Sequence, residues 1–283
     1  RAVKSTAEVA EIENALHVTR DMHHLAMRLA RPGIVEQEVV GAMEGLAATH
    51  GRRLAYPSIF TSRGEILHNH DHSVRLQGGE LIVNDTGANS PLGYASDITR
   101  TIPVGGRFTG LQAELYDLVL DAQTRAIAAA APGVPYRDLH ELACRTLVEG
   151  MKTLGFMRGD AAEAVQAGAH AIFFQCGTGH MMGLDVHDME GLGENDVGYG
   201  PGYERSTLFG HKSLRLARPL QEGFVVTIEP GLYVAPDDER APAELRGIGI
   251  RIEDDILVTA TGRRELGPHI ARSRKDVEAA CDA

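Results

Sequence analysis

The chain has 283 residues, of which 43% are hydrophobic and 24% charged, a composition typical of a folded globular protein and not of a disordered or fibrous one. Its 28 Lys and Arg against 39 Asp and Glu give a formal net charge of −11, which argues against a surface that binds nucleic acid or anionic lipid. No apolar run is long enough to cross a membrane, and the 3 cysteines lack C-x-x-C spacing, so we expect a soluble, cytoplasmic protein.

The first part of the chain carries two helix patterns. Ser5-x-x-Glu8 is a capping box, and the apolar residues that follow it at a spacing of three to four predict one long amphipathic helix. Arg31-Pro32-Gly33 is typical of a helix end, so we expect the helix to stop there. A second helix is predicted from Glu36 to His50, because its apolar residues share one face and a glycine follows.

Short apolar runs replace the helical spacing between Leu54 and Val104. They are separated by Gly, Asn and Pro, which is typical of strands joined by tight turns. We expect strands at Leu81–Val83 and at Tyr94–Ile102.

The second half of the chain repeats this order. Thr109-x-x-Gln112 predicts the start of a helix that reaches about Ala131, and another helix is expected from Tyr136 to Leu154. Three strands are then predicted, at Phe224–Ile228, Ile250–Glu253 and Ile256–Val258. Helices followed by strands, twice over, indicate an α+β fold with two similar halves around one sheet system.

Four carboxylates stand at or within the predicted strands, namely Asp85, Asp97, Glu229 and Glu253. An Asp at a strand end is often only a turn former, which is the simpler interpretation of Asp85 on its own. The other three need a different explanation, because a charge inside a strand must be paired or bound to a cation. If the four converge, their repulsion favours bound cations, and two divalent ions would neutralise four negative charges.

His180 lies between Gly179 and Gly183, in a segment where small residues allow the backbone to come close to a bound group. A hydrogen-bonded histidine in the core is the alternative interpretation. Four carboxylates with one imidazole and no cysteine favour Mn²⁺, Mg²⁺, Fe²⁺ or Co²⁺ over a structural zinc ion. The pattern therefore predicts a catalytic metal centre.

Other catalytic patterns are missing from the sequence. It contains no G-x-x-x-x-G-K-[ST] phosphate loop and no G-x-S-x-G serine-hydrolase motif. The cluster from His68 to His72 is one residue short of the zinc-hydrolase pattern H-x-H-x-D-H. We expect only one of these histidines to matter.

Five motifs follow one another along the chain: Asp85-x-Gly-Ala, Ser96-Asp-Ile-Thr-Arg-Thr, Gly179-His-Met-Met-Gly-Leu-Asp-Val-His-Asp, Thr227-Ile-Glu-Pro-Gly and Arg251-Ile-Glu-Asp-Asp. In this order they resemble the creatinase-like, pita-bread metallopeptidases, and within them Xaa-Pro aminopeptidases (aminopeptidase P) and Xaa-Pro dipeptidases (prolidases). The resemblance implies a single pita-bread catalytic domain over residues 1–283, with two similar α+β halves around a curved antiparallel sheet. The separate N-terminal domain that these peptidases usually carry has no counterpart in this chain.

The resemblance also implies a set of metal ligands. Asp97 and Glu253 would bridge two divalent metal ions, Asp85 would bind one of them, and His180 and Glu229 would bind the other. Mn²⁺ is the first expectation for both ions, with Co²⁺, Fe²⁺ and Zn²⁺ as alternatives.

The mechanism that the resemblance implies is hydrolysis by a hydroxide held between the two ions. Glu229 would take the proton of the attacking water and pass it to the leaving nitrogen, which in proline carries no hydrogen of its own. His68 and His187 would hydrogen-bond the substrate or the tetrahedral intermediate, and Arg251 would orient a bridging carboxylate. Cys176 departs from the family, which often has a pocket-lining histidine at this position.

The implied activity is cleavage of the N-terminal Xaa-Pro bond of a peptide with proline at its second position. An Xaa-Pro dipeptidase is the first alternative, because the features that separate the two activities lie outside the motifs. A creatinase-like hydrolase of non-peptide substrates and a catalytically inactive binding protein are the others, although all five ligand residues are present. We expect no nucleic-acid or membrane partner, and the sequence leaves a homo-oligomer open.

Overall fold

The computed structural model describes all 283 residues and shows the expected order of helices and strands twice. The first half contains α1 (Thr6–Leu29), α2 (Glu36–Thr49), β1 (Ile59–Thr61), β2 (Leu81–Asp85) and β3 (Thr99–Pro103). The helical part of the second half contains α3 (Gly110–Ala129), α4 (Tyr136–Thr153), α5 (Ala161–Gln166), the 3₁₀ helices η1 (Ala169–Ile172) and η2 (Glu190–Leu192), and α6 (Glu194–Gly198). The chain closes with β4 (Val225–Ile228), β5 (Gly231–Tyr233), η3 (Ala243–Leu245), β6 (Gly249–Arg251), β7 (Asp254–Thr259), β8 (Gly262–Glu265) and α7 (Arg274–Asp282).

The long helices begin where the sequence predicts. At the start of α1, the Glu8 backbone N–H donates to the Ser5 hydroxyl and the Glu8 carboxylate accepts from the Ser5 backbone N–H, so the capping box is confirmed. At α3, the Gln112 side chain accepts from the Thr109 backbone N–H at 3.3 Å. These contacts satisfy backbone donors that the first turn of a helix leaves without partners.

All strand pairs in the protein are antiparallel. One sheet has the order β1-β2-β3, another has the order β4-β7-β8, and β5 pairs with β6. An isolated bridge between Thr99 and Glu253 joins the first sheet to the segment between β6 and β7. The strands of the two halves therefore meet, and they meet beside the predicted metal ligands.

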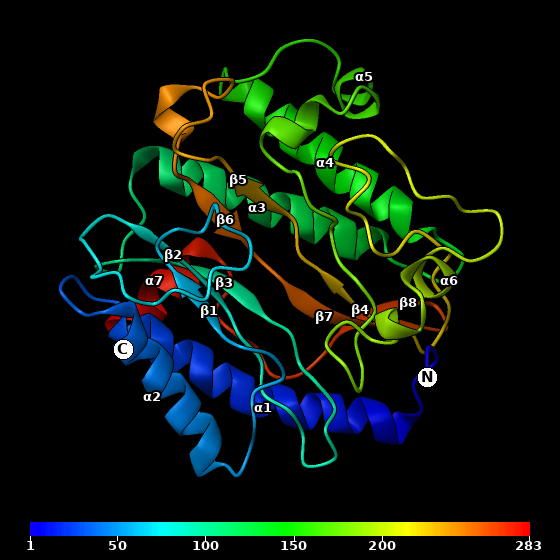
Figure 1. Ribbon diagram of the computed structural model, residues 1–283, viewed down its shortest axis with the longest axis horizontal. Coiled ribbons are helices and arrows are strands. Elements are labelled where there is room, and N and C mark those ends of the chain that lie inside the picture. The colour runs from blue at the N-terminus through cyan, green and yellow to red at the C-terminus, as the bar shows by residue number, and fades with distance from the viewer.

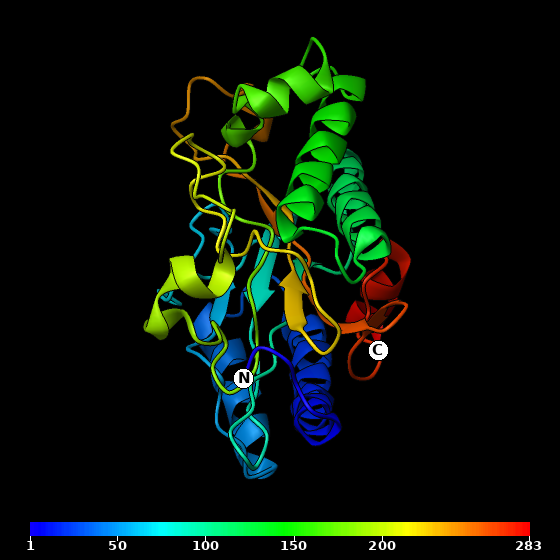
Figure 2. The ribbon, with the colours of Figure 1, turned by 90° about the vertical axis from the view of Figure 1, so that its right-hand side faces the viewer.

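The helices cover the strands on two sides, with α1 and α2 below and α3 and α4 above in the view of Figure 1. At the C-terminus, α7 contacts both α1 and α3, close to the position marked C in Figure 2. The largest apolar cluster contains 39 buried residues and includes side chains from all five of these helices and from the strands between them. Both halves thus share one core, and its burial is the main source of stability for the strand ends that carry the site.

The carboxylates that were predicted within strands lie mostly at strand ends. β3 begins at Thr99, so the strand predicted from Tyr94 is wrong over its first part. There the Asp97 backbone N–H donates to the Asp255 carboxylate at 3.1 Å and not to a neighbouring strand. Glu253 lies between β6 and β7, where its backbone N–H donates to the Thr99 carbonyl at 3.1 Å. At a strand end a side chain can face a cavity at the rim of the sheet.

The structure contains no helix with both the length and the apolar composition that crossing a lipid bilayer requires.

Candidate metal centre

The five predicted ligands come from both halves of the fold and meet at one cavity of about 300 Å³. Asp85 is the last residue of β2, Asp97 precedes β3, His180 lies in the glycine-rich segment after η1, Glu229 stands between β4 and β5, and Glu253 between β6 and β7. The other predicted site residues, His68, His187 and Arg251, line the same cavity. The structure therefore brings together every residue that the sequence assigned to the site.

His180 is held so that one ring nitrogen faces the carboxylates. Its Nδ1 hydrogen-bonds the Met181 carbonyl at 3.0 Å, which requires Nδ1 to carry the proton. Nε2 then lies 3.3 Å from Asp97 Oδ2 and 3.5 Å from Glu229 Oε1. Although burial lowers the pKa of His180, its contacts with Asp97 and Glu229 raise that pKa to about 9, so without a cation Nε2 holds a proton that a metal ion would displace.

Gly179 allows this placement. Its φ is +154°, and a Cβ at this position would lie 2.2 Å from the Tyr136 hydroxyl and 2.3 Å from the Thr227 carbonyl oxygen. The His180 backbone N–H donates to the Thr227 hydroxyl at 3.1 Å. The glycine thus lets the segment pack directly against β4, which fixes the imidazole beside Glu229.

Glu253 has one satisfied and one free carboxylate oxygen. Oε2 accepts a 2.6 Å hydrogen bond from the Thr99 hydroxyl, whereas Oε1 is buried and has no partner. The ligand atoms of Asp97, His180 and Glu253 lie within 4.8 Å of one another. A buried, unpartnered carboxylate oxygen beside two further donors fits a cation, because an uncompensated buried charge is otherwise strongly unfavourable.

The acidic groups are destabilised as anions in this cavity. Burial raises the pKa of Glu229 to about 7, although the charges of His180 and Arg251 act in the opposite direction. Burial also raises the pKa of Glu253 well above its ordinary value, and the charges of Asp97 and Glu229 raise it further. This is the repulsion expected for converging carboxylates without cations, so the donor set fits divalent metal ions.

The predicted substrate-binding histidines also line the cavity. The His187 ring lies edge-on to His180 with the centroids 4.4 Å apart, and burial lowers its pKa to about 3. His68 is exposed at the rim, and burial of part of its ring lowers its pKa. His70 is also exposed but lines the cavity, whereas His72 hydrogen-bonds the Phe60 carbonyl outside it.

Several residues that support the site were not found from the sequence. The Tyr56 hydroxyl lies 2.7 Å from Asp85 Oδ1 and 2.5 Å from Asp97 Oδ1, so it connects two of the carboxylates. Asp255 accepts from the Asp97 backbone. The acidic run that follows Glu253 could have drawn attention to Asp255, but nothing in the sequence around Tyr56 indicates its role.

Comparison with known proteins places the chain in a family. Residues 10–260 match the model of metallopeptidase family M24. The chain is 37% identical to an Xaa-Pro aminopeptidase of Escherichia coli (strain K12) over 99% of its own length and 59% of that protein. It is 36% identical to Xaa-Pro aminopeptidase 2 of Streptomyces coelicolor, again over 99% of its length and 56% of the relative. The chain thus spans less than two thirds of the length of these relatives.

The fold agrees with this match. The structure superimposes on aminopeptidase P from E. coli with a TM-score of 0.87 at 36% identity, covering 100% of this chain and 60% of the other. It also superimposes on proline aminopeptidase P II from Yersinia pestis with a TM-score of 0.87 at 37% identity, over 61% of that chain. The predicted α+β, pita-bread fold is therefore confirmed. This chain belongs to metallopeptidase family M24.

Proposed function

We propose that this chain forms the catalytic part of an Xaa-Pro aminopeptidase, a metal-dependent hydrolase that removes the residue preceding proline at the N-terminus of a peptide. The observation that carries the proposal is the convergence of four carboxylates and one imidazole in a single cavity, on the fold of a metallopeptidase family. The similarity to Xaa-Pro aminopeptidases over 99% of the chain supports the choice of substrate. We place the protein in the cytoplasm, and a homo-oligomer is compatible with the proposal.

Two divalent cations are the proposed cofactor, with Mn²⁺ first among them. Asp97 and Glu253 are assigned as ligands shared by both ions, Asp85 as a ligand of one, and His180 and Glu229 as ligands of the other. The free Oε1 of Glu253 and the Nε2 of His180, which faces Asp97 at 3.3 Å, support this assignment. When bound, such ions polarise the scissile carbonyl and lower the pKa of a water molecule.

Glu229 is the proposed proton carrier. Its Oε1 lies 3.5 Å from His180 Nε2, and its side chain keeps 19% of its surface exposed, whereas the Glu253 residue is 1% exposed. A carboxylate that reaches both the metal ligands and the open cavity can take a proton from the attacking water and deliver it to the leaving group. Delivery is essential because the proline nitrogen of an Xaa-Pro bond has no hydrogen of its own.

His187 and His68 are the proposed contacts to the substrate. Burial keeps the His187 ring neutral, since its pKa falls to about 3, so the ring can donate a hydrogen bond to a developing oxyanion without adding a charge. His68 stands at the exposed rim, where a peptide passes into the cavity. Cys176 lines the same cavity and makes this pocket different from one with a histidine at that position.

The proposal is tested with the metal-depleted protein and a panel of substrates. We expect Mn²⁺ or Co²⁺ to restore cleavage of Xaa-Pro-Yaa peptides, with release of the first residue only. Xaa-Pro dipeptides, matched peptides without proline, and creatine are the comparison substrates, and product identity separates the three activities. Cleavage that persists after exhaustive chelation, or that ignores proline, would reject the proposal.

A further inference from the structure

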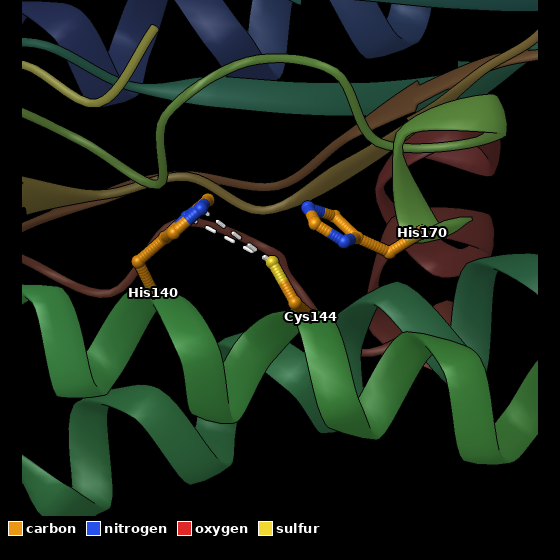
Figure 3. Close-up of side chains that lie close together, drawn as sticks. All are labelled: His140, Cys144 and His170. Carbon is orange, nitrogen blue, oxygen red and sulfur yellow. Dashed lines mark hydrogen bonds between the residues drawn. The ribbon is translucent and has the colours of Figure 1, made fainter. Parts of the chain in front are cut away.

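A second group of metal-binding side chains lies away from this cavity, in the second half of the fold. His140 and Cys144 project from consecutive turns of α4, and His170 faces them from η1 (Figure 3). The ligand atoms of these three side chains all lie within 4.8 Å of one another. None of the three lines the cavity that holds the carboxylates, so they form a separate cluster.

The cluster is buried and incompletely hydrogen-bonded. His140 and Cys144 are 0% exposed and His170 is 2% exposed. The Gly210 backbone passes close to the His170 ring, yet neither ring nitrogen has a hydrogen-bond partner of acceptable geometry. A buried imidazole with both nitrogens unsatisfied is costly, and it is the kind of group that a bound ligand would satisfy.

His140 is oriented like a metal ligand. Its Nδ1 shares a 2.8 Å hydrogen bond with the buried Thr178 hydroxyl, and its Nε2 lies 3.6 Å from Cys144 Sγ, within reach of a weak hydrogen bond. The spacing of four residues puts His140 and Cys144 on the same face of α4. A histidine that is held through one nitrogen and directs the other toward a thiol is placed as a ligand of a shared metal ion would be.

His211 lies beside the cluster. Its ring packs edge-on against His140 and His170, with centroid separations of 5.6 Å and 4.8 Å. Its Nε2 hydrogen-bonds the Val165 carbonyl at 3.0 Å and must therefore carry the proton, so Nδ1 is an acceptor. His211 is only half-buried, which leaves the cluster one side that is not sealed from solvent.

We propose that His140, Cys144 and His170 bind a transition-metal ion of borderline softness, Zn²⁺ or Co²⁺. One thiolate with imidazoles suits these ions, whereas the oxygen-rich cavity suits harder ones such as Mn²⁺. On binding, the bond from sulfur to the metal replaces the S–H bond of Cys144, and the proton leaves to solvent.

The protonation states agree with this assignment for the histidines. Burial lowers the pKa of His140 to about 3 and that of His170 to about 4, so both rings are neutral and able to coordinate near neutral pH. Burial raises the pKa of the Cys144 thiol well above its ordinary value. The metal must therefore displace this proton, and its affinity should increase with pH.

An ion at this position would link η1 to α4, because its ligands come from both elements. The chain after η1 continues into Phe173, whose carbonyl accepts a 2.7 Å hydrogen bond from the Tyr233 backbone N–H, and then into Cys176 of the cavity wall. The site would thus stabilise one wall of the carboxylate cavity without taking part in its chemistry.

The test uses Co²⁺ added to the metal-free protein. A Co²⁺ ion bound to a thiolate gives a sulfur-to-metal charge-transfer band in the near ultraviolet that oxygen and nitrogen ligands do not give. We expect this band in the unmodified protein, its loss in Cys144→Ser, and its retention in Cys176→Ser and Cys281→Ser. Saturation with Co²⁺ without such a band, or loss of the band in Cys176→Ser alone, would overturn the proposal.

A second arm separates this site from the carboxylate cavity and does not depend on how well Cys144→Ser folds. Glu253→Gln removes a predicted ligand of the cavity and leaves the cluster intact. This variant should still bind one equivalent of Zn²⁺, with a higher Tm and with X-ray absorption that shows one sulfur neighbour at about 2.3 Å. Bound Zn²⁺ without a sulfur neighbour, or no bound Zn²⁺ at all, would contradict the assignment.

Discussion

The Arg251 guanidinium donates a 2.6 Å hydrogen bond to the Asp85 carboxylate, and both residues are buried. The contact ties β6 of the second half to the last residue of β2 in the first half. Arg251 also donates to the Thr99 hydroxyl at 3.2 Å, and that hydroxyl donates to Glu253. Arg251 therefore orients one proposed ligand directly and a second one through Thr99, which is how supporting residues tune a metal centre.

Arg251→Lys should weaken metal binding although it keeps the positive charge. A lysine cannot reproduce the forked geometry that contacts both Asp85 and Thr99, so these groups lose their fixed orientation. We expect a 10–100-fold loss of Mn²⁺ affinity, the usual effect of removing a supporting residue. Competition with a metal-sensitive chelating dye measures the change.

The matched control for this variant is Arg264→Lys, because Arg264 forms an exposed ion pair with Glu13 on the outside of the fold. It should leave the affinity unchanged. An Arg251→Lys protein that binds Mn²⁺ as tightly as this control would show that Arg251 does not position the ligands.

The sequence predicted the helices better than the strands, for a physical reason. Helix limits such as the start of α1 at Ser5 depend on neighbours in the chain, so a local pattern reveals them. The limit of β3 depends on which residues lie opposite, and the contact of Asp97 with Asp255 across 158 positions cannot be read from local sequence. The five ligand positions were predicted by resemblance, whereas Tyr56, which only becomes a partner of Asp85 and Asp97 in the folded chain, was not.

Glu253→Gln should lower metal affinity and raise the stability of the metal-free protein. The amide keeps the shape of the carboxylate and its contact with Thr99, and it removes the cost of burying an ionisable group whose pKa is raised by burial and by the charges of Asp97 and Glu229. We expect the free energy of unfolding of the metal-free chain to rise by about 1–3 kcal/mol, while hydrolysis falls by at least about 100-fold. Urea unfolding in the presence of a chelator and steady-state peptide cleavage measure the two effects.

Glu239→Gln at an exposed position is the control for the same chemical change. Neither quantity should move in that variant. If the free energy of unfolding of the metal-free Glu253→Gln protein fell instead, the buried carboxylate would be stabilised by contacts within the protein and would not need a bound cation.

Gly179→Ala should disturb the position of His180 by a steric effect alone. The added Cβ would lie 2.2 Å from the Tyr136 hydroxyl and 2.3 Å from the Thr227 carbonyl, at a φ of +154° that suits glycine. We expect destabilisation by about 2–4 kcal/mol together with weaker metal binding, measured by urea unfolding and by metal titration. Gly41→Ala, in the exposed face of α2 with open space around it, should instead stabilise the protein by about 0.5–1 kcal/mol.

His23→Gln should reduce the loss of stability at acid pH. Burial, with a smaller contribution from the charge of Arg100, lowers the pKa of His23 to about 3 in the folded protein, whereas an unfolded histidine titrates near pH 6.5. Between these values the unfolded chain binds more protons, so the stability that neutral His23 provides is complete above about pH 6.5 and declines as the pH falls toward 3. The free energy of unfolding changes by about 1.4 kcal/mol per pH unit for one such group.

Urea unfolding across this pH range should give a dependence of the free energy of unfolding on pH that is shallower by that amount in the variant. His17→Gln, on the exposed face of the same helix, should leave this dependence unchanged. Equal slopes for His23→Gln and the unmodified protein would mean that His23 is not kept neutral by its buried position.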